Sequence, residues 1–100
     1  MLFIDARSLD YRLQALPADW EQIVADSGVP RSLAASAYNT RRAECGEAAR
    51  RLGVASLRDV ADPAQVETLD SPYRERARHV VSENLRVLEA AAGILSLIHI

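Results

Sequence analysis

The stretch from Arg31 to Gly53, RSLAASAYNTRRAECGEAARRLG, constrains the fold most strongly. Its apolar residues recur at spacings of mostly three and four, the pattern of one helical face. These residues are Leu33, Tyr38, Cys45, Ala48, Ala49 and Leu52. Ser32 can cap the first turn by accepting an amide hydrogen bond, and Gly53 can end the helix in the left-handed conformation. The sequence therefore predicts a helix between these two residues.

Two further starting points for helices follow. Asp62, Pro63 and Gln65 combine an N-cap acid, a proline at the first helical position and a glutamine that can reach back to the cap. Ser71 repeats the cap before the longest expected helix, from Pro72 to about Ile94. The apolar stripe of that helix consists of Tyr73, Ala77, Val80, Val81, Leu88 and Ala91.

The residues before the first helix have the character of strands. Leu2 to Ile4 form a continuous apolar run, and Tyr11 to Ala15 alternate apolar and polar residues. The polar segment between them predicts a turn, so we expect an antiparallel pair. Ile23 to Ala25 offer a third strand before Gly28 and Pro30 interrupt the pattern. The expected fold class is α+β, with two or three antiparallel strands followed by helices.

Three segments resemble the galactokinases of the GHMP kinase superfamily. Ser32 to Cys45, SLAASAYNTRRAEC, resembles the family's SLAxSxYNxRRxEC segment. Leu2 to Tyr11, LFIDARSLDY, resembles its LLIDCRSLEY strand and turn, and Arg76 to Arg86, RARHVVSENLR, resembles its RARHVxxEN helix. The three lie in the family's order and together cover most of the chain.

The resemblance implies part of a two-lobe GHMP kinase fold. Residues 1–30 would be the strands that end the N-terminal lobe, which is of the ribosomal protein S5 domain 2-like type. Residues 31–94 would be the helices that begin the C-terminal lobe. Residues 95–100, LSLIHI, look like a translated sequencing adapter, so we expect a non-native tail there.

The resemblance also implies a function, namely ATP-dependent phosphorylation of galactose to galactose 1-phosphate by an enzyme that uses ATP and Mg²⁺. The single cysteine, Cys45, cannot form an internal disulfide, which favours a cytoplasmic location. Tyr38 would contact the sugar, because an amphipathic ring with a terminal hydroxyl can lie on a pyranose and hydrogen-bond it. Without the resemblance, a core tyrosine is the simpler interpretation. We assign no catalytic, cofactor-binding or metal-binding residue to the chain.

A phosphate-binding loop needs clustered glycines or serines at a helix N-terminus, whereas the four glycines of this chain stand alone. We therefore expect the chain alone to be inactive and to bind no cofactor. Two related interpretations stay open: a GHMP kinase for N-acetylgalactosamine or arabinose, and a galactokinase-like sugar sensor without turnover. A third, independent of the resemblance, is a helical interaction module that docks through the stripe of the Pro72 to Ile94 helix.

Several polar residues have simpler interpretations than a catalytic role. Arg31 follows Pro30, where many family members carry a basic residue near the transferred phosphate, so we do not assign Arg31 to catalysis. Arg41 and Glu44 form an i,i+3 pair on a charged face that also carries Arg42 and Glu47, and we expect this face to be solvated.

His79 lies four residues from both Glu75 and Glu83, but a metal site would need a further convergent ligand. Cys45 is expected to be an inert thiol of the apolar stripe. The formal charge of −2, from 12 basic and 14 acidic groups, gives no support for nucleic-acid binding. The apolar C-terminal run is about half the length of a membrane span, so we expect no membrane segment.

Overall fold

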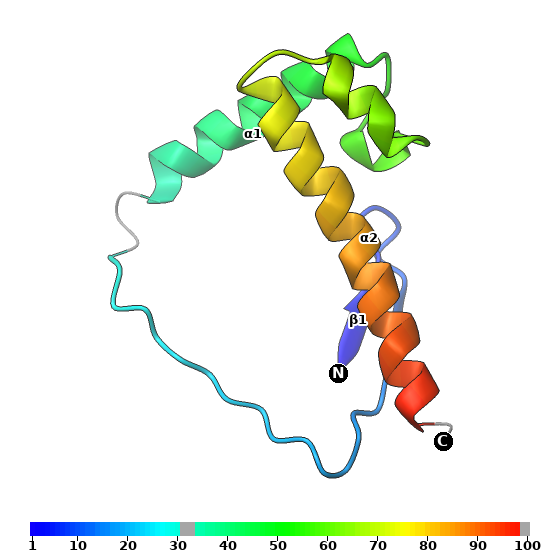
Figure 1. The fold of residues 1–100 in the computed structure, drawn as a ribbon. Helices are drawn as coiled ribbons and strands as arrows, with labels where there is room; N and C mark the ends of the chain where they lie inside the picture. The colour runs from blue at the N-terminus through cyan, green and yellow to red at the C-terminus, as the bar shows by residue number, and fades with distance from the viewer. Residues whose placement is uncertain (31–33, 99–100) are drawn as a thin grey trace. The chain divides into compact units, whose positions relative to one another are not determined.

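The structure is a computed structural model that describes residues 1–30 and 34–98 (Figure 1). It confirms the α+β class, with one two-stranded antiparallel sheet and helices. Two compact units form, one from Met1–Asp26 with Arg86–Ile100 and the other from Ser27–Leu85. The elements in chain order are β1 (Leu2–Ile4), β2 (Tyr11–Leu13), α1 (Ala34–Arg51), the 3-10 helices η2 (Leu57–Asp59) and η3 (Pro63–Thr68), and α2 (Tyr73–Ile98).

Strands β1 and β2 form the expected hairpin, in which Phe3 pairs with Arg12. The Asp5 carboxylate stabilises the turn by accepting hydrogen bonds from the backbone amides of Arg7, at 2.9 Å, and Ser8, at 3.2 Å. Leu9 closes the turn at a φ of 63°, and its amide donates to the Asp5 carbonyl oxygen at 2.8 Å. A short polar loop with an aspartate at its start thus reverses the chain as predicted.

The third strand expected at Ile23 to Ala25 is wrong, because residues 14–30 contain no strand. The side chains of Ile23 and Val24 are 86% and 88% exposed. An apolar β-branched run is suited to a sheet, but it becomes a strand only where a neighbouring strand pairs with its backbone groups. The described segments provide no such pairing for Ile23 to Ala25.

The end of α1 follows the sequence prediction. Gly53 has a φ of 72°, and its amide donates to the Arg50 carbonyl at 3.1 Å. The Val54 amide reaches the Ala49 carbonyl, also at 3.1 Å, which completes a Schellman motif. The expected cap at Ser32 lies outside the described residues.

The second helix start is also confirmed, but the element is a 3-10 helix. The Asp62 carboxylate accepts a hydrogen bond from the Ala64 amide at 3.0 Å, and Pro63 occupies the first turn. The extended conformation of Leu69 ends η3 after six residues. A six-residue segment can form few i to i−4 hydrogen bonds, so it gains little stability as an α-helix. It adopts instead the i to i−3 hydrogen bonds of a 3-10 helix, which are common in short segments.

Helix α2 begins as expected but runs to Ile98, four positions beyond the predicted end at Ile94. Its C-terminal half lies with the hairpin in one compact unit. There the buried Gln14 side chain donates from Nε2 to the Ala91 carbonyl oxygen at 3.1 Å. Ala91 is buried as the stripe predicts, whereas Leu88 is mainly exposed.

The core of the other unit joins the second half of α1 to the first half of α2. The buried cluster consists of Ala48, Ala49, Leu57, Val66, Leu69, Ala77 and Val81. Partly buried apolar residues around it include Cys45, Leu52, Tyr73 and Val80. Alanines dominate the two long helices here, and small side chains allow helix axes to approach closely. Val66 is the largest fully buried side chain.

We expect Val66→Ala to lower the free energy of unfolding by about 2 kcal/mol, because it removes two methyl groups from a packed site. Val66 is only 1% exposed, whereas Val87 on α2 is 51% exposed, so Val87→Ala is the matched control with a much smaller effect. Urea denaturation followed by circular dichroism measures both. Equal effects of the two substitutions would contradict the assigned core.

Candidate functional site

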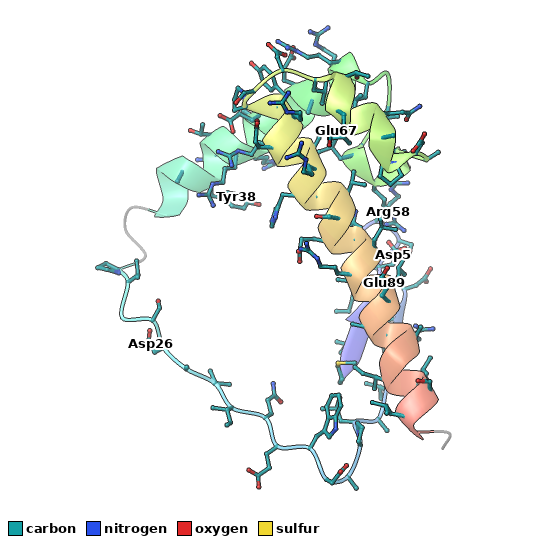
Figure 2. All side chains as sticks on the ribbon, in the orientation of Figure 1. Asp5, Asp26, Tyr38, Arg58, Glu67 and Glu89 are labelled. Carbon is teal, nitrogen blue, oxygen red and sulfur yellow. The ribbon has the colours of Figure 1, made fainter. Side chains whose placement is uncertain are left out.

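Tyr38 lies in the first half of α1, ahead of the part of that helix that enters the core (Figure 2). Its side chain is 65% exposed. Successive residues turn about 100° around a helix axis, so Tyr38 lies on the same side of α1 as Cys45 and Ala49. The face of α1 that is buried in its second half is therefore open around Tyr38. Within the described segment, Tyr38 is not part of the core.

Three interactions fix α1 against the elements that follow it in the same unit. Glu44 on α1 pairs with Arg76 on α2 at 2.5 Å. Arg51 pairs with Asp70 at 2.6 Å, and its guanidinium lies 4.0 Å from the centre of the Tyr73 ring. These contacts lie beside the alanine-rich core and hold the second half of α1 against the start of α2. Because α1 is continuous, they also fix where Tyr38 lies relative to the start of α2.

Among the described residues, the two acids of α1, Glu44 and Glu47, pair with arginines other than Arg41 and Arg42. Glu47 accepts hydrogen bonds from Arg50, at 2.6 and 2.8 Å, and from Arg51 at 3.0 Å. These bonds lower the pKa of Glu47 from 4.5 to about 2, with Arg50 the larger cause. The i,i+3 pair expected between Arg41 and Glu44 is wrong, because Arg76 on another helix reaches Glu44 instead.

Arg41 and Arg42 are exposed. Within residues 1–30 and 34–98, they are the two arginines for which the structure gives no carboxylate, aromatic or other interaction partner. No acidic residue occurs in the first turn of α1 either. Tyr38 is therefore followed, one turn on, by two positive charges that the described residues do not neutralise.

Cys45 is a free, partly buried thiol packed against the core. Burial raises its pKa, and the nearby Arg76 opposes that shift only in part. A raised pKa reduces the reactive thiolate fraction, which fits the expected inert role. Arg31, which the sequence analysis does not assign to catalysis, lies outside the described residues.

The chain is 48% identical over 101 aligned residues to the galactokinase of Roseiflexus sp. (strain RS-1), an alignment that covers 93% of this chain. It is 42% identical over 100 residues, 94% of the chain, to the galactokinases of two Haemophilus influenzae strains, PittEE and Rd. The chain belongs to the galactokinase family. It spans about a quarter of the relatives' length, since each alignment covers 26% of theirs. No protein-family model matches it.

The remaining candidate site on this galactokinase segment is the possible metal site of His79, Glu75 and Glu83 on α2. No group of three potential metal ligands occurs among the described residues. Hydrogen bonds from its own backbone amide, and from Ser71 and Arg74, lower the pKa of Glu75. These partners hold the Glu75 carboxylate at the start of α2.

A shallow hollow of about 200 Å³ lies on the hairpin and is lined by Phe3, Asp5, Asp10, Tyr11 and Arg12. Arg12 occupies one side of it, with its guanidinium 4.5 Å from the centre of the Phe3 ring. None of the residues that the sequence singled out for sugar binding lines this hollow. In the two described ranges, no helix combines the length and apolar character needed to cross a bilayer.

The lowered pKa of Glu47 predicts a pH dependence of stability. Its carboxylate is ionised and hydrogen-bonded in the folded chain, so the stabilisation is complete above the ordinary pKa of 4.5 and is lost as the pH falls towards 2. We expect the Glu47→Gln variant to lose less thermal stability than the parent chain over this interval. Thermal midpoints measured from pH 6 to pH 2 test this, with Glu89→Gln as the control. An identical profile for Glu47→Gln and the parent would contradict it.

Proposed function

We propose that this chain is the sugar-binding segment of a galactokinase that transfers the terminal phosphoryl group of ATP to the anomeric hydroxyl of galactose. In this proposal residues 1–30 end the N-terminal lobe of the GHMP kinase fold, and residues 31–94 begin the C-terminal lobe. The whole enzyme would work in the cytoplasm. The kinship with curated galactokinases over more than nine-tenths of the chain supports the activity.

The exposed position of Tyr38 is the observation that carries the role of this chain. Its phenol is available for contact, although it lies on the side of α1 that is otherwise buried. An aromatic face with a terminal hydroxyl can pack on the carbon face of a pyranose and hydrogen-bond one of its hydroxyls. Tyr38 would thus orient the sugar, and orientation is a large part of what an enzyme contributes to phosphoryl transfer.

The nucleotide with its Mg²⁺ would supply the phosphoryl group and neutralise its charge. The described residues offer no fitting site for either, since they contain no glycine-rich loop and no group of three potential metal ligands. We therefore assign no step through ATP or Mg²⁺ to this chain. Its own part is to bind and orient the sugar.

The alternatives differ from this proposal in substrate or in turnover. A kinase for N-acetylgalactosamine or arabinose would use the same helix with a different sugar, and a sugar sensor would bind without phosphoryl transfer. The names of the curated relatives favour galactose. Val81 of the docking stripe is buried and Val80 is partly buried against the core, whereas Leu88 of the same stripe is 58% exposed, so the case for the helical interaction module is weakened only in part.

A chimera tests the proposal, with this chain in place of the matching segment of the Roseiflexus galactokinase. We expect the chimera to phosphorylate galactose. Tyr38→Phe should weaken galactose binding by about 1 kcal/mol, or about fivefold, because one hydrogen bond to the sugar is lost. Steady-state kinetics should show this as a higher KM for galactose with an unchanged KM for ATP.

Tyr11→Phe is the matched control, because Tyr11 is also an exposed tyrosine but lies on the hairpin. It should leave the kinetics unchanged. Equal KM values for galactose in Tyr38→Phe and the parent chimera would remove Tyr38 from the sugar site. A folded chimera that binds galactose without turnover would favour the sensor, and preference for arabinose or N-acetylgalactosamine would identify the other kinases.

A further inference from the structure

We draw no further inference here: the strongest candidate, the apolar face of the β1–β2 hairpin formed by the exposed side chains of Leu2, Ile4, Tyr11 and Leu13, is an unpartnered surface, and nothing in the structure shows what covers it.

Discussion

The packing of α1 against the start of α2 is the constraint on which the candidate site depends. Ala48 and Ala49 of α1 share a buried cluster with Ala77 and Val81 of α2. The Glu44–Arg76 and Arg51–Asp70 ion pairs lie beside this cluster. Exposed ion pairs add little stability, so burial of apolar surface holds the helices while the charges favour one arrangement.

The same packing decides which charges of α1 remain available. Intrahelical spacing alone would let Glu44 pair with Arg41, at about 0.2 to 0.5 kcal/mol for such a pair. Once α2 packs beside α1, Arg76 reaches Glu44, and the cluster of Glu47, Arg50 and Arg51 forms at the helix end. Among the described residues, no carboxylate then pairs with Arg41 or Arg42, which follow the exposed Tyr38 by one helical turn.

Many large apolar residues outside the core are exposed in this chain. The chain spans about a quarter of its relatives' length. The hairpin has only two strands, and Ile23 and Val24 are among the most exposed apolar residues. Two-stranded sheets are marginally stable by themselves in water. The division of the chain between two kinase lobes stays a prediction, as does the contact of Tyr38 with a sugar.

The sequence by itself determined the hairpin turn, the Gly53 helix end, the Asp62 cap and the galactokinase kinship, because local hydrogen bonding and residue motifs carry these features. It could not show that the run from Ile23 to Ala25 stays unpaired, because a strand depends on a distant partner. Only the tertiary structure decided that Tyr38 is exposed and that Glu44 turns to Arg76, since burial and ion pairing depend on which elements pack together.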